Sequence, residues 1–167
     1  MNTSPDTNIP LRRGFILLLL LVANGMPVVL GILLRQHFAW PLDAGRNFLD
    51  GRRLFGASKT VRGILGSIAV TAVVAPVCGL DRASGALFGL LAMAGDLTSS
   101  FIKRRLAYPS GSQHPLLDQL PEACLPLWLL APVTGANYTE MAVAIAAFTV
   151  LNLLLSRLYR SGQARCK

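Results

Sequence analysis

Two aspartates in apolar surroundings are the residues best suited to chemistry in this chain. Asp96 stands toward the end of one apolar run, and Asp118 comes directly before another. A carboxylate is costly to keep inside or beside an apolar helix, which makes it a functional-site hypothesis by default. Two carboxylates that meet at a helix-end cavity suit Mg²⁺, because this ion typically takes one or two carboxylates plus substrate phosphates. The sequence therefore predicts a Mg²⁺ site held by Asp96 and Asp118.

Asp96 shares one helix face with other polar residues. On a period of 3.6 residues, Asp96, Ser99 or Ser100, and Lys103 follow one stripe of the predicted helix. A carboxylate, a hydroxyl and an ammonium group on one stripe favour a ligand or metal site. The alternative is a structural ion pair between Asp96 and Lys103, which stand two helical turns apart.

The segment 41–62 has the composition of a phosphate-binding loop. Its glycines suit tight turns and close approach of the backbone to a ligand. Ser58-Lys59-Thr60 comes just before a predicted helix N-terminus at Val61–Gly63, where free N–H groups and partial positive charge attract phosphate. The GxxxxGK[ST] order of a P-loop is absent, with Gly56-x-x-Lys59-Thr60 in its place.

Charged side chains strengthen the interpretation of this segment as a phosphate-binding loop. Arginine has a planar fork that matches two phosphate oxygens at once, and aspartates between the arginines would orient them or contact a base or sugar. The alternative is a basic loop that contacts anionic lipid, which accounts for the arginines but not for the glycines or aspartates. The charged residues concerned are Asp43, Arg46, Asp50, Arg52, Arg53 and Lys59.

No pair of nucleophile and general base stands out. His114 is interpreted as a loop residue and not as a base, and Glu122 as either a third acid or a helix cap. Phosphoryl-type transfer does not require such a pair, because positioning and charge neutralisation supply the catalysis.

The elements that must position these residues are membrane-spanning helices. Of the 167 residues 53% are hydrophobic and only 14% charged, and the mean hydropathy is +0.51, too apolar for an ordinary soluble domain. Five apolar stretches approach the roughly 20 residues that cross a bilayer core as a helix. We predict an all-α integral membrane protein, one domain over residues 1–167, with a polar cavity facing the cytoplasm. The expected helices are 14–34, 63–80, 84–102, 118–136 and 140–158.

The basic residues predict the orientation. Most of the 16 lie in three segments that five spans place on one side, namely 35–62, 103–115 and the tail from Arg157. The positive-inside rule puts this side in the cytoplasm and the protein in the cell membrane, although Arg12 and Arg13 argue mildly against it. A nucleic-acid partner is excluded, since the basic residues alternate with apolar runs and do not belong to a soluble module. The three cysteines show no metal or disulfide spacing.

The three polar segments together resemble the CDP-archaeol synthase family, a branch of the membrane cytidylyltransferases that includes CDP-diacylglycerol synthase. The resemblance is carried by Asp50-Gly51-Arg52-Arg53-Leu54-Phe55-Gly56-x-x-Lys59-Thr60-x-x-Gly63, by Gly95-Asp96-x-x-x-Ser100-Phe101-x-Lys103-Arg104, and by Pro115-x-Leu117-Asp118-Gln119. The first motif is long and specific, and the other two are shared more loosely with the diacylglycerol branch. The match covers most of the chain, from about Asn24 to the end.

The resemblance implies transfer of CMP from CTP to a lipid phosphomonoester, which gives a CDP-lipid and pyrophosphate, with Mg²⁺ as cofactor. The lipid is archaeol-phosphate-like or phosphatidic-acid-like, and membrane lipids surround the enzyme. The family pattern assigns catalytic roles to Lys59, Asp96, Lys103 and Asp118, with Asp96 and Asp118 as metal ligands. It assigns lipid-phosphate binding to Ser100, Lys103 and Arg104. We predict CTP binding by Asp50, Gly51, Arg52, Arg53, Gly56, Lys59, Thr60 and Gly63 of the first motif, and by Asp43 and Arg46, which precede it and would order the loop or contact the nucleotide.

Two other functions compete with this one. A non-catalytic transporter or anionic-lipid-binding assembly protein predicts that only charge matters at Lys59. A CDP-alcohol phosphotransferase would carry its aspartates in one DGxxAR-type run, whereas the aspartates here are spread over three segments. The sequence leaves open whether copies of the chain form a homo-oligomer.

Overall fold

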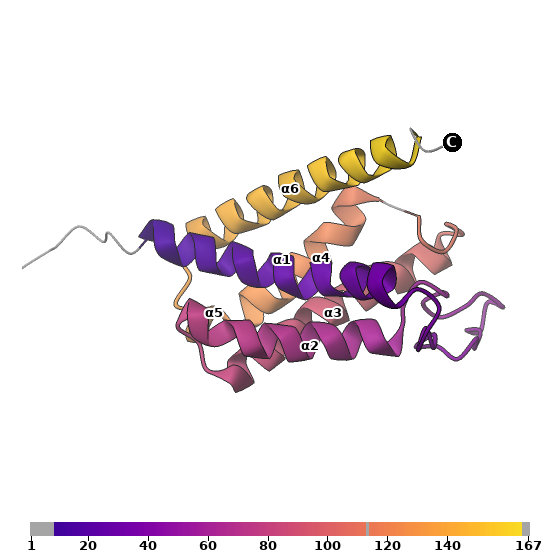
Figure 1. Ribbon diagram of the computed structural model, residues 1–167, viewed down its shortest axis with the longest axis horizontal. Coiled ribbons are helices and arrows are strands. Elements are labelled where there is room, and N and C mark those ends of the chain that lie inside the picture. The colour runs from indigo at the N-terminus through magenta and orange to yellow at the C-terminus, as the bar shows by residue number, and fades with distance from the viewer. Residues whose placement is uncertain (1–8, 113, 165–167) are drawn as a thin grey trace, which may run out of the picture.

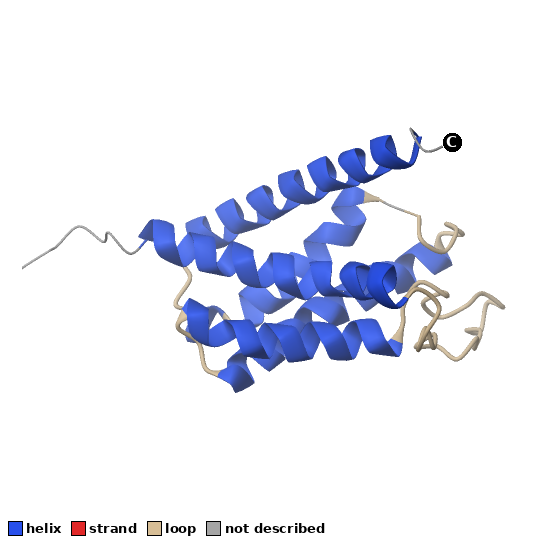
Figure 2. Ribbon diagram, viewed as in Figure 1, coloured by secondary structure: helices blue, strands red, loops and turns tan. Residues whose placement is uncertain are grey.

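The protein is a bundle of helices. The computed structural model describes residues 9–112 and 114–164, with side chains over 14–112, 114 and 117–154. The described residues form no strand, and their β-type pairing is limited to two isolated bridges in the loop after the first helix (Figure 2). The prediction of an all-α protein is confirmed. In chain order the elements are α1 (Ile9–Leu34), α2 (Val61–Val74), the 3₁₀ turn η1 (Ala75–Cys78), α3 (Arg82–Arg105), α4 (Pro115–Leu129), α5 (Ala131–Thr134) and α6 (Tyr138–Ala164).

The long helices run up and down along one axis (Figure 1). We call the end that carries residues 35–60 and 106–114 the loop end, and the end that carries residues 75–81 and 130–137 the turn end. Helix α3 packs against both α2 and α4 and also contacts α1, whereas α6 lies against α1 and α4. The two connections of the loop end therefore begin at neighbouring helices.

Three helices of the described chain are long and apolar enough to cross a membrane: Gly14–Leu34, Val61–Cys78 and Arg82–Arg105. Large apolar side chains such as Ile32 and Val73 are exposed on them. Polar groups face inward instead, since the hydroxyl of the buried Ser67 donates to the carbonyl of Ala23 at 2.6 Å. A protein in lipid needs apolar side chains on its outer surface and polar groups in its interior. The prediction of a membrane protein is therefore confirmed. That α4 and α6 also cross stays a prediction; the apolar part of α6, Tyr138–Leu154, is shorter.

Small residues let α3 lie directly on α2. A β-carbon at Gly85 would lie 2.8 Å from the carbonyl oxygen of Thr71, and one at Gly89 would lie 3.2 Å from that of Ser67. These contacts are with backbone, which cannot move aside as a flexible side chain can. The Gly85-x-x-x-Gly89 spacing therefore allows the two helices to pack closely.

The expected helix positions are close to the observed ones, with one break. The fourth expected helix, 118–136, is divided at Leu130 into α4 and the single turn α5, and Pro132 stands in the first turn of α5. Proline is accepted in a first turn, because its missing N–H would have no partner there. Proline alone does not cause the division, since Pro121 and Pro126 lie inside α4. The second expected helix likewise ends as the 3₁₀ turn η1 around Pro76.

Candidate active site

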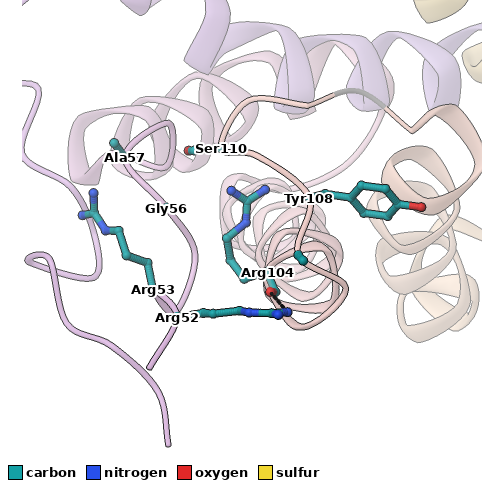
Figure 3. A pocket seen from close by; sticks show the side chains of 8 residues that line it. Arg52, Arg53, Gly56, Ala57, Arg104, Tyr108 and Ser110 are labelled. Atoms are coloured by element: carbon teal, nitrogen blue, oxygen red, sulfur yellow. Dashed lines mark hydrogen bonds between the residues drawn. The ribbon is translucent and has the colours of Figure 1, made fainter. Parts of the chain in front are cut away.

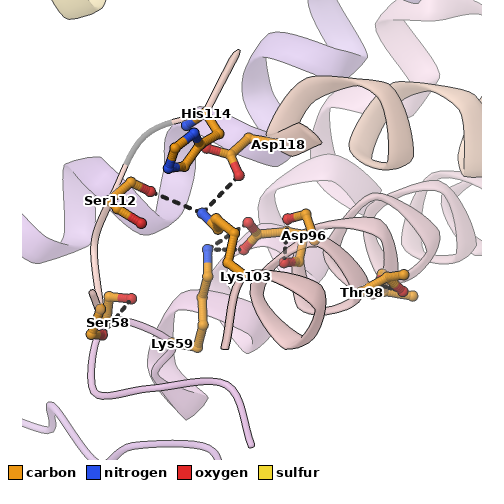
Figure 4. A network of polar contacts seen from close by, with 11 residues as sticks. Ser58, Lys59, Asp96, Thr98, Lys103, Ser112, His114 and Asp118 are labelled. Atoms are coloured by element: carbon orange, nitrogen blue, oxygen red, sulfur yellow. Dashed lines mark hydrogen bonds and ion pairs between the residues drawn. The ribbon is translucent and has the colours of Figure 1, made fainter. Parts of the chain in front are cut away.

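Two lysines at the loop end each meet an aspartate from another segment (Figure 4). The Nζ atom of Lys59 lies 2.5 Å from both carboxylate oxygens of Asp96. The Nζ atom of Lys103 lies 2.7 Å from Oδ1 of Asp118. All four side chains are at most 22% exposed. The fold thus brings the first, second and third polar segments to one place, as predicted.

Lys59 is fixed by the start of α2. Thr60 is the N-cap of this helix, and its hydroxyl accepts the N–H of Gly63 at 3.3 Å. The carbonyl of Lys59 accepts the N–H of Leu42 at 2.8 Å, which joins the two ends of the loop. A threonine that satisfies a first-turn N–H is a usual helix start, so the local sequence alone directs the lysine to this point.

Asp118 serves two neighbours at the start of α4. Its Oδ2 atom accepts the N–H of His114 at 2.9 Å, while Oδ1 faces Lys103. Lys103 also donates to the carbonyl of Ser112 at 3.0 Å. His114 is the N-cap residue of α4, and its ring stacks on Tyr108 with centroids 3.9 Å apart. The expected alternative, an ion pair between Asp96 and Lys103 within α3, is wrong, because each pairs with a different segment.

Gly95 explains how α3 and α4 come close enough for this. A β-carbon at Gly95 would collide with the carbonyl group of Pro121 and lie 2.7 Å from the amide nitrogen of Glu122. Without that β-carbon the Glu122 carboxyl group comes within hydrogen-bonding reach of Asp96 and near Lys59 and Asp118. The sequence allowed two interpretations of Glu122, a third acid of the site or a helix cap. Its position beside Asp96 favours the first.

Asp43 organises the loop that carries Lys59. Its buried carboxylate accepts hydrogen bonds from Arg53 Nη2 at 2.6 Å and from the N–H of Gly56 at 2.9 Å. The N–H groups of Gly45 and Phe55 bond to the same carboxylate. Burial alone would raise the pKa of Asp43, but these four donors outweigh burial and lower it from 3.8 to about 2. Asp43 is therefore a scaffold residue of the loop, ionised throughout the physiological range.

A cavity of about 420 Å³ opens at the loop end, and its wall includes neither of the two lysines nor their aspartate partners (Figure 3). The Arg104 side chain, which is mostly buried, points toward it from the end of α3 and donates to the carbonyl of Pro109 at 2.7 Å. Gly56, with φ of +97°, leaves room there, since a β-carbon would lie 2.6 Å from the hydroxyl of Ser110. Three arginines on its wall make the cavity a site for anionic oxygens. Residues on the wall include Arg52, Arg53, Gly56, Arg104, Tyr108 and Ser110.

The remaining predicted residues divide into exposed and structural positions. Arg46 and Gly51 are exposed at loop turns. Asp50 accepts from Arg105 at 2.6 Å, and Arg52 donates to the carbonyl of Arg105 at 2.6 Å. Sequence reasoning gave Arg105 no role, because three consecutive basic residues carry no signal of which one turns toward the loop.

Ser100 and Gly63 are both buried. Ser100 lies in the interior of the last part of α3, 2% exposed. A β-carbon at Gly63 would lie 3.1 Å from Cβ of Pro27, so this glycine allows α2 to approach α1. Gly63 is therefore a packing position as well as the first-turn donor to Thr60.

The donor chemistry of the site fits Mg²⁺. Carboxylate oxygens are the ligands that this ion prefers, and it usually completes its shell with water and phosphate oxygens. The described residues contain no group of three His, Cys, Asp or Glu side chains arranged to hold a metal by themselves. Mg²⁺ would therefore take one or two carboxylate ligands from the protein and its other ligands from water and from a phosphate.

Comparison with known proteins gives consistent results. A family model described as CDP-archaeol synthase matches residues 8–160. The CDP-archaeol synthase of Hyperthermus butylicus is 33% identical over 162 residues, covering 89% of this chain and 92% of that protein. The CDP-archaeol synthase of Pyrobaculum calidifontis is 41% identical over 135 residues, covering 78% and 77%. A solved structure of an intramembrane enzyme for archaeal membrane lipid biosynthesis superposes with a TM-score of 0.74 at 31% identity, covering 85% and 90%.

Proposed function

The chain belongs to the CDP-archaeol synthase family, and we propose that it transfers the cytidylyl group of CTP to the phosphate of a membrane lipid. Membership of this family makes the protein an enzyme, a CTP-dependent nucleotidyltransferase. The alternative function, a non-catalytic transporter or anionic-lipid-binding assembly protein, is therefore rejected. The reaction joins the lipid phosphate to the α-phosphorus of CTP and releases pyrophosphate, leaving a CDP-activated lipid.

The observation that carries the proposal is the meeting of Lys59, Asp96, Lys103 and Asp118 at one end of the bundle. These residues lie in a loop, in α3 and in α4, so local structure alone does not place them together. A cluster of alternating charge at the same end of the bundle as a cavity lined by arginines suits a substrate with several phosphates and a reaction that redistributes their charge.

The bonds that form and break in this reaction suggest a role for each cationic residue. An oxygen of the lipid phosphate attacks the α-phosphorus, and the bond from that phosphorus to the β-phosphate oxygen breaks, so negative charge grows on the leaving pyrophosphate. Lys59 and Arg53 would stabilise that charge, and Lys103 with Arg104 would orient the attacking lipid phosphate or the leaving group. A dianionic phosphate needs no general base, which agrees with the lack of a nucleophile–base pair in the sequence.

Asp96 and Asp118 would hold Mg²⁺. When bound, the ion supplies neutralisation of phosphate charge. Lys59 and Lys103, paired with these same carboxylates, are then near enough to contact the phosphates that share the ion.

The expected lipid is a phosphomonoester of the archaeol type, because the relatives bear that name. A phosphatidic-acid-like lipid is the second choice. We propose further that the protein lies in the cell membrane with the loop end in the cytoplasm, where CTP is found. The basic residues of the loop end support this orientation.

The test is product formation by the purified protein. Detergent-solubilised protein is incubated with CTP labelled at the α-phosphate, MgCl₂ and a panel of ether- and ester-linked lipid phosphates, and lipid extracts are examined for label. We expect a labelled CDP-lipid and an equal amount of pyrophosphate, with the archaeol-type phosphate preferred. Protein that is folded and monodisperse but labels none of the lipids would refute the proposal.

A further inference from the structure

Two arginine pairs meet at the loop end, Arg52–Arg53 in the loop and Arg104–Arg105 at the end of α3. Arg52, Arg53 and Arg104 line the cavity, whereas Arg105 does not. Arg52 and Arg105 in addition join the loop to the end of α3. Arg53 lies in an extended bridge with Asn47, where neighbouring side chains point to opposite sides.

Arg105 makes the fastening contacts from the α3 side. Its Nη1 atom donates to Asp50 at 2.6 Å. Its Nη2 atom donates to the carbonyls of Arg53 at 2.7 Å and Arg52 at 3.3 Å. Its guanidinium carbon lies 4.9 Å from the ring centroid of Phe48, a cation–π distance.

The contacts are reciprocal. Arg52 Nη1 donates to the carbonyls of Arg105 at 2.6 Å and Arg104 at 3.3 Å, in the last turn of α3. The Arg104 carbonyl also accepts the N–H of Ala107 at 3.2 Å. Phe101, one turn earlier in α3, lies 4.9 Å from the Arg105 guanidinium and packs edge-on against Phe48 at 5.3 Å. We call this set the arginine clasp: Phe48, Asp50, Arg52, Phe101 and Arg105.

We propose that Arg105 is a positioning residue for the proposed cytidylyl transfer. It fixes the backbone of Arg52 and Arg53 against the end of α3, so that the loop and the helix supply Arg53 and Arg104 to the same cavity. The inference rests on the proposed function, and it adds a residue that does not itself line the cavity. Only arginine suits this position, because a lysine ammonium lacks the planar fork that reaches a carboxylate and two carbonyls at once.

Arg105→Lys tests the inference because it keeps the charge and removes the geometry. We expect the dissociation constant of CTP, measured calorimetrically with MgCl₂ and without lipid, to rise on the order of tenfold or more, since misplacement by about 1 Å can cost up to a hundredfold. The KM for CTP should rise in parallel while kcat changes less. A purely structural role would lower the active fraction and leave KM unchanged.

Arg62→Lys is the matched control. Arg62 also donates to backbone carbonyls at the loop end, those of Arg35 and His37, but lies outside the clasp. We expect wild-type affinity for CTP. Should Arg105→Lys fail to fold, Phe48→Leu removes one aromatic face from the exposed side of the loop and should weaken CTP binding in the same direction, by less.

The outcomes separate the two proposals. Wild-type protein that binds CTP yet makes no CDP-lipid refutes the proposed function and leaves the clasp to be judged from the binding constants. Wild-type protein that makes CDP-lipid while Arg105→Lys binds CTP equally well refutes the clasp alone. Equal losses in Arg105→Lys and Arg62→Lys also refute it, as does a wild-type protein that binds no CTP.

Discussion

The two ends of the bundle use their acidic residues differently. At the loop end Asp43, Asp50, Asp96 and Asp118 each pair with a cation. At the turn end Asp81 accepts the N–H of Ser84 at 2.9 Å, three residues away, and caps α3. Both ends are visible in Figure 1, joined by α2 and α3.

Glu140, like Asp81, caps a helix at the turn end. Its carboxylate accepts the N–H of Asn137 at 3.1 Å, and the Asn137 side chain accepts the N–H of Glu140 at 2.9 Å, a reciprocal cap at the start of α6. Acids at the turn end thus complete their own helices, whereas three of the four paired aspartates at the loop end join residues more than 12 positions apart. The number of acidic residues therefore does not identify the candidate active site. The site is identified by acidic residues whose hydrogen-bond or ion-pair partners are distant in the sequence.

The largest effect is expected from Asp96→Asn, compared with Asp81→Asn on the same helix. The first change removes charge from the proposed metal site and should lower CDP-lipid formation on the order of a thousandfold, a usual cost of losing one transition-state contact. The second removes only a cap and should leave turnover within a few-fold. Both rates are measured on monodisperse protein, and full activity of Asp96→Asn would remove this residue from the site.

Lys59→Arg sharpens the comparison by keeping charge at the loop end. Arginine can contact both oxygens of Asp96 through its fork, but it is longer and planar, so its charge would not lie where the Lys59 ammonium lies. We expect kcat/KM for CTP to fall about ten- to a hundredfold, as for small misplacements of reacting groups. Arg82→Lys at the turn end is the control. If charge alone mattered at position 59, turnover would be unchanged.

Gly95→Ala tests how the loop end is assembled. The new methyl group would meet the backbone of Pro121 and Glu122, so α3 and α4 would separate. We expect a loss of about 1–3 kcal/mol in stability, the usual cost of overpacking, and a fall in activity that exceeds the unfolded fraction. Gly31→Ala is the control, because a β-carbon there meets no atom of the described chain within 4 Å. Thermal denaturation in detergent with parallel assays measures both quantities.

The smallest effect concerns pH and Asp43. Its pKa is lowered from 3.8 to about 2 in the folded loop, so its contribution to loop stability is complete above pH 3.8 and is lost as the pH falls through about 2. Pepsin, active throughout this window, should spare residues 43–56 at pH 4 and cleave them near pH 2. Asp43→Asn should be cleaved equally at both values. Cleavage of the wild type at pH 4 would contradict the assignment.

Much of this comparison could be predicted from the sequence. Hydropathy predicted where the helices lie, since lipid requires continuous apolar helix. The interruption of the fourth helix was not predicted, because α4 also contains Pro121 and Pro126 without a break, so that Pro132 alone does not mark the division. The motifs around Lys59, Asp96 and Asp118 predicted the segments that meet. The lysine partners were not predictable, because helical periodicity allows an ion pair between Asp96 and Lys103 and carries no information on pairs between separate segments, which are the ones observed.

Other features depend on contacts between distant backbones. The need for glycine at position 95 appears only when α4 is placed against it, and the same contact brings Glu122 beside Asp96. The role of Arg105 depends on the path of residues 48–53, which no local pattern specifies. Sequence patterns predict which segments are polar, whereas the fold decides which of their side chains meet.

Manganese binding tests the central claim most directly, that Asp96 and Asp118 serve one site. Mn²⁺ replaces Mg²⁺ and is counted by electron paramagnetic resonance in the presence of CTP for the wild type, Asp96→Asn, Asp118→Asn and the double variant. The account predicts one CTP-dependent ion per wild-type chain and its loss in each single variant, with no further loss in the double variant. Retention of the ion at wild-type affinity in either single variant would contradict it.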